Sequence, residues 1–389
     1  MAARAPGVRS GPCLAGHRRA GAALRRAGGR AGARAAGARA AAAAGNGGDG
    51  AVRAALERLF AGEDLGQAAT AATLGELLAV DNPAQTAAFL VALRMKGETP
   101  EEIAGLATAM KQVAVRADCG PGVIDIVGTG GDDIGSVNIS TGACVVAAAA
   151  GGKIAKHGNR SVSSLCGSAD VIEEFGVAVD LGPEGVAACV RESNMGFMFA
   201  PRYHPAMKAV VPVRKALKVR TAFNILGPML NPADAEYALV GVYTPDLQKL
   251  MADSLQNLGV KKALIVHSMG LDELTPLGHA DVYEVGPGGT KQYQVFPEKL
   301  GIPKCEVADL KGGDRALNAQ ILRDVFGGAQ NAVADALNLN AGFALAAGGI
   351  AATPEDGIAM AQEAQRAGKA GATLAKWVET SQAERAKEA

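Results

Sequence analysis

The sequence predicts an α/β fold in two parts, in which a small all-helical domain precedes a large α/β domain with a central, mostly parallel sheet. Three observations predict it. Apolar residues between positions 51 and 117 recur at helical spacing. Beyond residue 118, short β-branched runs alternate with helical segments. The chain has 389 residues, more than one average domain of ~100–200 residues.

The small helical domain is expected at 51–117 and to be completed by residues from about 205–232. Its apolar stripe appears at Leu56, Leu59 and Phe60, and again at Phe89, Leu90 and Leu93. A helix start is predicted at Thr99, because Pro100 takes the first helical position and Glu102 completes a capping box. The stretch 205–232 is helical in pattern and punctuated by proline, so it interrupts the alternation of strands and helices around it.

The large α/β domain is expected to contain residues 118–204 and 233–376, with 377–389 as a solvated tail. Strands are predicted at 123–127, 153–156, 177–181, 237–242 and 263–267. Helices are predicted at about 140–150, 168–175, 183–195 and 247–258. Because strands that alternate with helices pair in parallel through right-handed crossovers, the sheet is expected to be largely parallel.

Residues 1–48 have a composition of their own. They contain nine Arg, 18 Ala and 11 Gly, with no Lys and no acidic residue. Such a segment offers almost nothing to bury and is predicted to be disordered. An Arg-rich, acid-free start is typical of organelle transit peptides, although Ser10 is the only hydroxyl residue here. A basic arm that binds nucleic acid is the alternative.

The formal net charge of zero is the sum of a basic segment, 1–48, and an acidic remainder. The chain has 39 basic and 39 acidic residues, so removal of the nine basic residues of 1–48 leaves a charge of −9. This charge opposes binding to nucleic acid, because phosphate backbones reward clustered positive charge. The most apolar run, 143–150, is much shorter than the ~20 residues that span a membrane. Neither nucleic acid nor membrane is expected as a partner.

The cysteines show no paired spacing. They lie at positions 13, 119, 144, 166, 189 and 305, and no CxxC motif occurs. This scatter is typical of reduced thiols and argues against a zinc site or a disulfide framework. A reducing compartment is therefore expected, such as the cytosol, the stroma or the matrix.

A glycine-rich loop follows the first predicted strand. It consists of Gly128, Thr129, Gly130, Gly131 and Asp132, and Ser136, Asn138, Ser140 and Thr141 come shortly after it. Glycines at the carboxyl end of a strand let backbone N–H groups approach a phosphate, and the start of the next helix favours an anion. The loop matches neither the dinucleotide-binding pattern nor the P-loop. A structural turn with an ordinary helix cap is the alternative.

A second polar loop follows the second predicted strand. It contains Lys156, His157, Gly158, Asn159, Arg160, Ser161, Ser163 and Ser164. Two cations, an imidazole and three hydroxyls can surround a phosphate or pyrophosphate, with Lys as a point charge and Arg as a fork. A solvated surface loop is the alternative.

Two adjacent carboxylates, Asp272 and Glu273, follow the predicted strand 263–267. Carboxylates at the carboxyl end of a strand suit Mg²⁺ that is shared with phosphate oxygens of a substrate. The alternative is the first turn of a helix, where acidic residues are common. Next to two predicted phosphate-binding loops, the metal site is the favoured interpretation.

Taken together, these motifs resemble the anthranilate phosphoribosyltransferase family. The matching segments are 128–132, 138–141, 156–161, 204–205, 213–214, 224–228, 270–273, 312–314 and 338–341. The similarity extends from about Ala51 to Lys376. It implies a nucleoside-phosphorylase-like phosphoribosyltransferase fold and a homodimer formed through the helical domains. It also implies transfer of the phosphoribosyl group of phosphoribosyl pyrophosphate to the amine of anthranilate, a step of tryptophan biosynthesis.

The resemblance further implies which residues bind each ligand. Phosphoribosyl pyrophosphate would contact Gly128, Thr129, Gly130, Gly131, Asp132, Ser136, Asn138, Ser140, Thr141, Lys156, His157, Gly158, Asn159, Arg160, Ser161, Ser163, Ser164 and Ser168. Anthranilate would contact Gly128, His157, Asn159, His204, Arg214 and Pro228. Mg²⁺ would be held by Ser140, Asp272 and Glu273. Because the amine of anthranilate is already neutral, no residue is assigned as an obligatory general acid or base.

One position departs from the family pattern. The family carries an acidic residue two positions before Leu271, where this chain has Met269. The departure bears on a second metal site and leaves the two carboxylates intact. For an enzyme of amino-acid biosynthesis, the composition of 1–48 favours the plastid stroma over a mitochondrion.

Two other functions are compatible with parts of the sequence. A pyrimidine nucleoside phosphorylase shares the fold but typically has Lys-His-Ser before its Thr-Gly-Gly, where this chain has Val127-Gly128. A non-catalytic relative that binds nucleic acid is the other alternative, and the charge of −9 opposes it.

Overall fold

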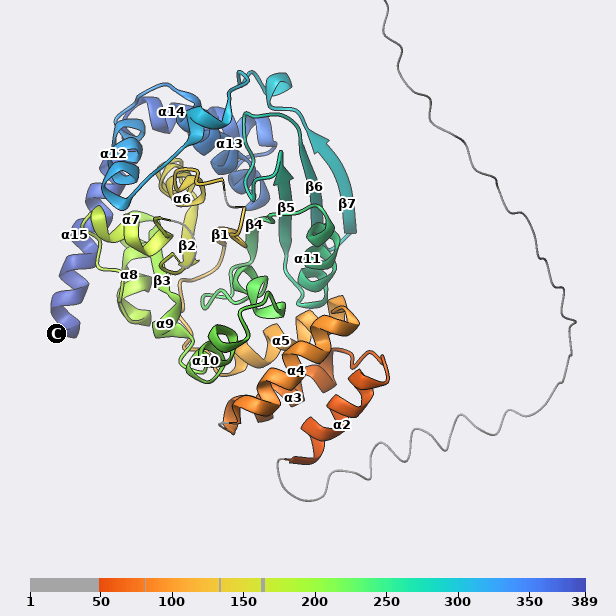
Figure 1. Ribbon diagram of the computed structural model, residues 1–389. Coiled ribbons are helices and arrows are strands. Elements are labelled where there is room, and N and C mark those ends of the chain that lie inside the picture. The colour runs from red at the N-terminus through yellow and green to blue at the C-terminus, as the bar shows by residue number, and fades with distance from the viewer. Residues whose placement is uncertain (1–48, 81, 133, 162–164) are drawn as a thin grey trace, which may run out of the picture. The chain divides into compact units, whose positions relative to one another are not determined.

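The computed structural model describes residues 49–389, apart from 81, 133 and 162–164 (Figure 1). Its first part contains the helices α2 (Asp49–Phe60), α3 (Gln67–Ala79), α4 (Pro83–Lys96) and α5 (Pro100–Gln112). The predicted capping box at the start of α5 is confirmed. The Thr99 hydroxyl accepts the N–H of Glu102, and the Glu102 carboxylate accepts the N–H of Thr99.

A seven-stranded sheet forms the centre of the remaining chain. Its strands are β1 (Val123–Gly128), β2 (Lys153–Gly158), β3 (Met195–Phe199), β4 (Tyr237–Gly241), β5 (Lys262–Ser268), β6 (Ala280–Gly286) and β7 (Gly289–Val295). Their spatial order is β3-β2-β1-β4-β5-β6-β7. The first five strands in this order pair in parallel, whereas β6 and β7 form an antiparallel hairpin at one edge. The prediction of a mostly parallel sheet is confirmed, and the hairpin was not predicted.

Helices cover both faces of the sheet. The helices after β1 are α6 (Ile139–Ala149), α7 (Ser168–Glu174), α8 (Pro183–Ser193), α9 (Ala200–Tyr203), α10 (Met207–Leu217), α11 (Asp246–Asn257), α12 (Arg315–Phe326), α13 (Ala332–Ala347), α14 (Pro354–Arg366) and α15 (Lys369–Glu388). Successive residues of a strand point to opposite faces. Accordingly, Leu239 of β4 packs in one core with α6 and α13, and Val240 packs in a second core with α11 and α5.

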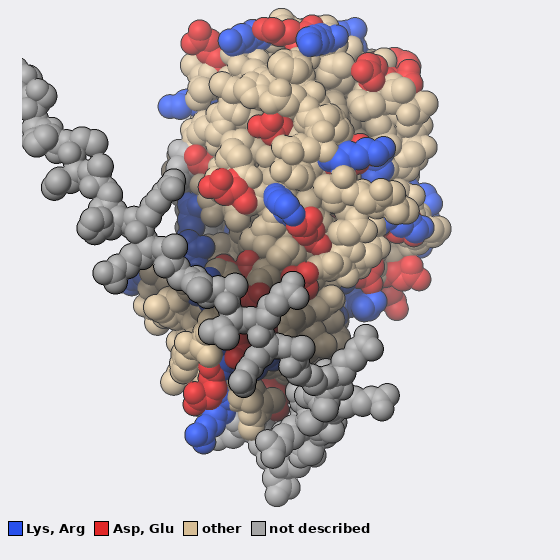
Figure 2. Space-filling view, turned by 90° about the vertical axis from the view of Figure 1, so that its right-hand side faces the viewer, with Lys and Arg blue, Asp and Glu red and all other residues tan. Residues whose placement is uncertain are grey.

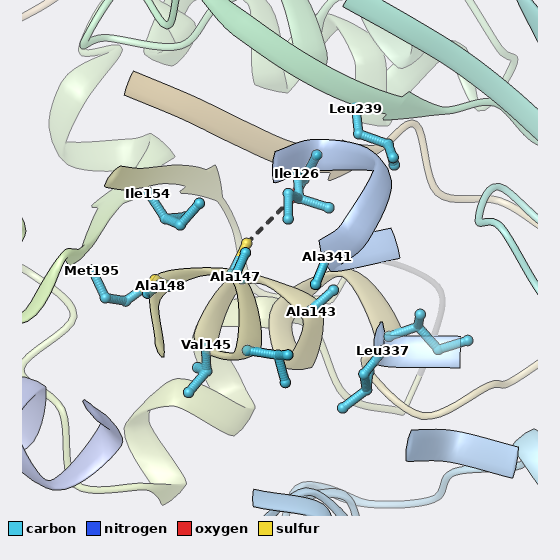
Figure 3. Packing of buried hydrophobic residues seen from close by; sticks show 14 of the residues in the cluster. Ile126, Ala143, Val145, Ala147, Ala148, Ile154, Met195, Leu239, Leu337 and Ala341 are labelled. Carbon is cyan, nitrogen blue, oxygen red and sulfur yellow. Dashed lines mark hydrogen bonds between the residues drawn. The ribbon is translucent and has the colours of Figure 1, made fainter. Parts of the chain in front are cut away.

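Small side chains let α6 lie close to its neighbours. In Figure 3, Ala143 of α6 and Ala341 of α13 face each other beneath Ile126 of β1. A Cβ atom added at Gly142 would lie 2.8 Å from side-chain atoms of Leu322 and Leu337. This close packing fixes the N-terminal end of α6, which follows the glycine-rich loop.

The predicted strand at 177–181 is wrong, and β3 was missed. The apolar residues of the run 177–181 are buried, whereas Asp180 is exposed, and the run pairs with none of the described strands. Instead, the N–H of Ala178 donates to the hydroxyl of Ser381 on α15. The helix predicted at 183–195 ends at Ser193, with Asn194 as its left-handed C-cap, and the last predicted residue, Met195, starts β3.

The interpretation of 377–389 as a solvated tail is wrong for its first part, because these residues continue α15. Trp377 and Ser381 occupy one face of this helix and are fully buried. Their spacing of four residues brings both side chains to the same side of a helix. The sequence pattern was diluted by the many Ala, Lys and Glu residues on the exposed faces.

The last residues of α15 also hold the start of α8. The carboxylate of Glu388 accepts the N–H of Gly182, which precedes α8, at 2.8 Å. The same carboxylate pairs with Arg202 at 2.8 Å. An acidic group at a helix N-terminus is favourable, because it satisfies a free N–H and complements the helix dipole.

The segment 205–232 packs against the first helices of the chain. Its helix α10 contacts α4, and its buried residues Val210, Val213 and Phe223 belong to the same core as α2 to α5. Among the described helices, none is long and apolar enough to cross a membrane. Figure 2 shows acidic and basic side chains interspersed on the face in view, with wide areas that carry neither.

Candidate active site

The glycine-rich loop and the carboxylate pair meet at the edge of the sheet where parallel strands end. Gly128 at the end of β1 is paired with Gly241 at the end of β4. Asp272 packs directly on both glycines, since a Cβ atom at either position would overlap it. Its carboxylate also accepts the N–H of Gly130 at 2.7 Å. The structure thus brings together two motifs that lie far apart in the sequence.

The glycine loop adopts a conformation that only glycine takes without strain. Gly130 and Gly131 have φ angles of 68° and 86°, in the left-handed region. The loop is anchored beneath by Thr129, whose N–H donates to the Gly241 carbonyl at 2.9 Å. Its hydroxyl accepts the N–H of Tyr243 at 3.3 Å. The backbone is therefore held in place while the glycines leave room for a ligand.

Glu273 connects this loop to α6 and to the second polar loop. Its carboxylate accepts the N–H of Ser140, in the first turn of α6, at 3.1 Å. The buried Lys156 donates to the Ile126 carbonyl at 2.6 Å and to the Ser140 hydroxyl at 3.4 Å. Ser140, Lys156 and Glu273, which come from the three predicted motifs, therefore converge.

The carboxylate pair is buried and resists ionisation in the absence of a cation. Among the described residues, no basic side chain forms an ion pair with Asp272 or Glu273. Burial, with repulsion from Asp272, raises the pKa of Glu273 to about 8, although Lys156 partly offsets this. Burial, with repulsion from Asp132, raises the pKa of Asp272 to about 6. Such a pair favours a bound cation.

The oxygen donors around this pair fit Mg²⁺. The described residues contain no cluster of three or more His, Cys, Asp or Glu in a metal-binding arrangement. Two carboxylates with a nearby hydroxyl are an incomplete set, which suits Mg²⁺ because this ion keeps waters and shares substrate phosphate oxygens. The residues Ser140, Asp272 and Glu273 could hold the ion on these grounds.

Two buried histidines lie next to each other beside the end of β2. The rings of His157 and His204 meet edge to face with centroids 5.0 Å apart. Nδ1 of His157 lies 3.3 Å from the Gly227 carbonyl, directly before Pro228. Nε2 of His157 and both ring nitrogens of His204 make no hydrogen bond of normal geometry with a described residue. These nitrogens are available to a ligand.

Both rings are neutral at physiological pH. Burial lowers the pKa of His157 to about 3, and His204 adds to the effect. Burial also lowers the pKa of His204, and the backbone near Leu230 partly offsets this. An uncharged pair suits an aromatic ligand better than a phosphate.

The neutral His157 predicts a loss of stability in acid. Its pKa is lower in the folded chain than the ~6.5 of an unfolded chain, so the stabilisation is present above pH 6.5 and is lost as the pH falls. Between pH 6.5 and 5 the free energy of unfolding should fall by ~2 kcal/mol from this residue. Urea unfolding of wild type and His157→Gln at both pH values would measure it. An equal loss in the two proteins would contradict the prediction.

Arg160 pairs with acidic side chains of the helix that follows its loop. Its guanidinium pairs with Asp170 at 3.0 Å and Glu173 at 2.9 Å, both on α7. It also lies over the ring of Phe199 at 5.5 Å. These pairings tie the loop to α7, and the expected direct contact between Arg160 and phosphoribosyl pyrophosphate stays a prediction.

The other predicted residues of this region lie around the same loop. The side chain of Asn159 accepts the N–H of Arg160 at 2.8 Å. The N–H of Ser161 donates to Asp170 at 3.2 Å. Ser168 is the first residue of α7 and lies beside Gly158. A Cβ atom added at Gly158 would lie 3.3 Å from Cβ of Ser168. Ser163 and Ser164 lie outside the described residues.

Asn138 is fixed by partners that the sequence did not reveal. Its carboxamide oxygen accepts Nδ2 of Asn318 on α12 at 2.9 Å. Its own Nδ2 donates to the Cys166 carbonyl at 3.1 Å. Ser136 forms a β-bridge with Lys311, which lies close to Asn318 in sequence. The remaining predicted residue, Thr141, is buried, and its hydroxyl has no partner among the described residues.

Arg220 links the segment 205–232 to the glycine loop. Its guanidinium lies over the ring of Tyr243 at 4.3 Å and donates to the Gly131 carbonyl at 3.4 Å. The same residue lines a cleft of about 350 Å³ together with residues of α4, and this cleft contains none of the predicted site residues. Arg214, on α10, is half-buried and forms no ion pair within the described part of the chain.

Met269 lies in a tight turn before the carboxylate pair. Met269 and Gly270 have φ angles of 49° and 91°, and hydrogen bonds join Ser268 and Leu271 in both directions. The Met269 side chain is half exposed and lies against Gly278. The departure from the family pattern therefore lies on the turn, outside the contacts of Asp272 and Glu273.

Comparison with known proteins places the chain in a family. Residues 53–114 match the helical bundle domain of a glycosyl transferase family, and residues 120–371 match its a/b domain. An anthranilate phosphoribosyltransferase of Chlamydia felis is 46% identical over 302 residues, which cover 77% of this chain and 88% of that protein. One from Rubrobacter xylanophilus is 44% identical over 333 residues, with 85% and 97% covered. The chain belongs to the anthranilate phosphoribosyltransferase family.

Solved structures of the family agree in fold. The anthranilate phosphoribosyltransferase of Thermus thermophilus matches with a TM-score of 0.80 and 41% identity, over 84% of this chain and 99% of that chain. The enzyme from Saccharomyces cerevisiae, in complex with phosphoribosyl pyrophosphate and Mg, matches with a TM-score of 0.79 and 26% identity, over 86% and 99%. A further structure of the yeast enzyme contains 4-fluoroanthranilate.

Proposed function

We propose that this chain transfers the phosphoribosyl group of phosphoribosyl pyrophosphate to the amine of anthranilate, which gives N-(5-phosphoribosyl)anthranilate and pyrophosphate in tryptophan biosynthesis. The observation that carries the proposal is the meeting of Asp272 with the glycine loop and of Glu273 with α6 at one edge of the sheet. Membership of the family supports it.

The chemistry requires positioning and charge neutralisation more than acid–base catalysis. Displacement at C1 of the ribose builds positive charge on the sugar and negative charge on the leaving pyrophosphate. The left-handed glycines leave room for phosphate oxygens close to the backbone, and the dipole at the N-terminus of α6 favours an anion there. Mg²⁺ held by Ser140, Asp272 and Glu273 would supply further neutralisation of the pyrophosphate.

The anthranilate site is proposed to lie beside the two neutral histidines. The free ring nitrogens of His157 and His204 can meet the amine without adding charge next to the developing cation. Gly128, Asn159, Pro228 and Arg214 complete the proposed set. Because the anthranilate amine is uncharged, it attacks without a base, and its proton leaves after the C–N bond forms.

Arg214→Ala is expected to raise the KM for anthranilate by ~10- to 100-fold with little change in kcat, because a lost charge-assisted hydrogen bond costs ~1.5–3 kcal/mol. The half-buried guanidinium without an ion pair suits the anthranilate carboxylate. Steady-state kinetics with each substrate varied would measure the effect. Lys215→Ala, at the exposed neighbour on α10, is the matched control. An unchanged KM for anthranilate in Arg214→Ala would exclude this role.

The direct test of the proposed function is a fluorescence assay. Loss of anthranilate fluorescence should require both phosphoribosyl pyrophosphate and Mg²⁺, with a chain that starts at residue 49. Phosphorolysis of thymidine without any turnover of anthranilate would instead assign the chain to the nucleoside phosphorylases.

We further propose that the helical domain comprises residues 51–117 and about 205–232, and that it forms a homodimer. The packing of α10 on α4 supports the assignment of 205–232 to this domain, with 118–204 and 233–376 as the α/β domain. Phe60 and Met95 are large apolar side chains, 69% and 83% exposed, on the helical domain, and they support a protein interface there. A monomeric mass in light scattering would contradict the homodimer.

Residues 1–48 are proposed to direct the chain to a plastid. The support is their Arg-rich, acid-free composition and their position before the family match, which begins at residue 53. Fusion of these residues to a fluorescent protein in plant cells would test the proposal. Mitochondrial or cytosolic fluorescence would contradict it.

A further inference from the structure

We propose that Asn340 is a positioning residue that fixes the backbone of the metal-binding segment, and that it thereby sets the affinity for Mg²⁺. Asn340 belongs to α13 and contacts neither proposed substrate. The inference rests on the proposed function, because it concerns the ion that Asp272 and Glu273 would hold.

The carboxamide of Asn340 forms two hydrogen bonds with the backbone of Leu274, the residue directly after Glu273. Its oxygen accepts the N–H of Leu274 at 3.1 Å, and its Nδ2 donates to the carbonyl of Leu274 at 2.7 Å. The second proton of Nδ2 donates to the Ala336 carbonyl at 2.9 Å. Asn340 and Leu274 are both fully buried. One side chain thus matches the donor and the acceptor of a single peptide residue, as a neighbouring strand would.

The segment needs such a partner because it leaves the sheet at this point. β5 ends at Ser268, and Asp272 and Glu273 follow a tight turn and belong to no described strand. Buried backbone groups without partners cost free energy, so an irregular segment this deep must be held by side chains. Leu274 directly follows Glu273 and lies two positions after Asp272. A shift of the Leu274 backbone therefore moves both carboxylates directly.

A role in the stability of α13 alone does not explain why position 340 is asparagine. Asparagine is a weak helix former, and a buried carboxamide costs free energy unless it is bonded. If the side chain at position 340 only packed against its neighbours, Leu or Ala would be more favourable there. Asn338, two residues earlier on the same helix, is also buried, but its carboxamide oxygen has no partner among the described residues. It provides a matched control.

The test measures metal affinity separately from catalysis. In Asn340→Asp the shape is kept, the N–H of Leu274 still has an acceptor, and the donor to the Leu274 carbonyl is lost. The variants Asn340→Asp, Asn340→Ala and the control Asn338→Ala are compared with wild type. Direct binding of Mn²⁺, followed by electron paramagnetic resonance in the presence of phosphoribosyl pyrophosphate, is measured beside turnover over a range of Mg²⁺ concentrations.

Both Asn340 variants should weaken Mn²⁺ binding and raise the Mg²⁺ concentration for half-maximal turnover by ~10- to 100-fold, the usual effect of losing a partner that orients metal ligands. The KM for anthranilate should stay within about twofold, because the hydrogen bonds of Asn340 reach no residue of the proposed anthranilate site. Asn338→Ala should bind Mn²⁺ as wild type does. Wild-type Mn²⁺ affinity in both Asn340 variants would overturn the inference.

Two further outcomes keep the inference separate from folding and from the proposed function. If neither Asn340 variant folds, hydrogen exchange of the wild-type chain decides, because the Leu274 amide should then be as protected as the strands without any metal. Rapid exchange of that amide would overturn the inference. A wild-type chain without anthranilate turnover, but with Mn²⁺ binding that depends on Asn340, would count against the proposed function alone.

Discussion

Replacement of Asp272 by Asn together with Glu273 by Gln is expected to lower Mg²⁺-dependent turnover by ~10³-fold or more. The two carboxylates are the buried negative charges that would hold the ion, and an ion that stabilises a leaving pyrophosphate contributes several kcal/mol to the transition state. The amide oxygens can still accept the N–H groups of Gly130 and Ser140, so the loop and α6 keep their anchors. The loss would therefore report on charge and not on shape.

The same double variant should fold as well as wild type in the absence of metal. Burial raises the pKa of both carboxyl groups, to about 6 and about 8, so the ionised pair opposes folding. The stability of metal-free wild type should fall as the pH rises from the unfolded pKa values of ~4 to these folded values, because over this range the folded chain keeps protons that the unfolded chain has lost. The variant lacks this dependence.

Thermal unfolding with and without Mg²⁺, beside the fluorescence assay, would measure both effects. The matched control is Glu355→Gln with Asp356→Asn, an adjacent and more accessible acidic pair at the start of α14. It should keep wild-type turnover. Full activity in the Asp272 and Glu273 variant would remove the metal role from these residues.

Gly241→Ala is expected to destabilise the protein by ~2–3 kcal/mol and to lower turnover by ~10²-fold. A Cβ atom at this position would overlap the backbone carbonyl of Asp272. A carbonyl in the main chain cannot rotate away as a side chain can. The whole segment would have to move, and with it the carboxylate that meets the glycine loop.

Substitutions at two other glycines test whether the effect at Gly241 is steric. At Gly128 an added Cβ would meet the side chain of Asp272, which can rotate, so Gly128→Ala should lower turnover with a smaller loss of stability. At Gly75, in α3, an added Cβ would meet nothing within 4 Å. Gly75→Ala should therefore stabilise the chain by ~0.5–1 kcal/mol. Equal effects at Gly75 and Gly241, in urea unfolding and turnover, would contradict the steric account.

The meeting of the motifs could be predicted from the sequence because it follows from a general property of parallel sheets. The glycine loop, the Lys156 loop and the carboxylate pair each follow a predicted strand, and parallel strands end at one edge. Strands that are β-branched and end in glycine, as β1 does, are also the easiest to recognise. The α6 and α11 helices were predicted to within about two residues for the same reason.

The rest depended on partners that are distant in sequence. The run 177–181 has the composition of a strand, yet a hydroxyl on α15 takes the place of a neighbouring strand. The sequence did not reveal that Arg160 pairs with two acidic residues of α7. Asn318 and Asn340 gave one usable signal, because asparagine inside a helix requires a reason. That signal indicates that the asparagine has a buried partner, but it does not identify the partner.

The attachment of α15 has a consequence for the time at which the α/β domain can complete its fold. The hydrogen bonds from Ala178 to Ser381 and from Gly182 to Glu388 join residues 203 and 206 positions apart. During synthesis, these backbone groups must wait until almost the entire chain has been made. The run 177–181 is thus an exposed apolar segment in every nascent chain. Truncation before Ser381, about two and a half helical turns from the C-terminus, would extend that exposure to the finished protein.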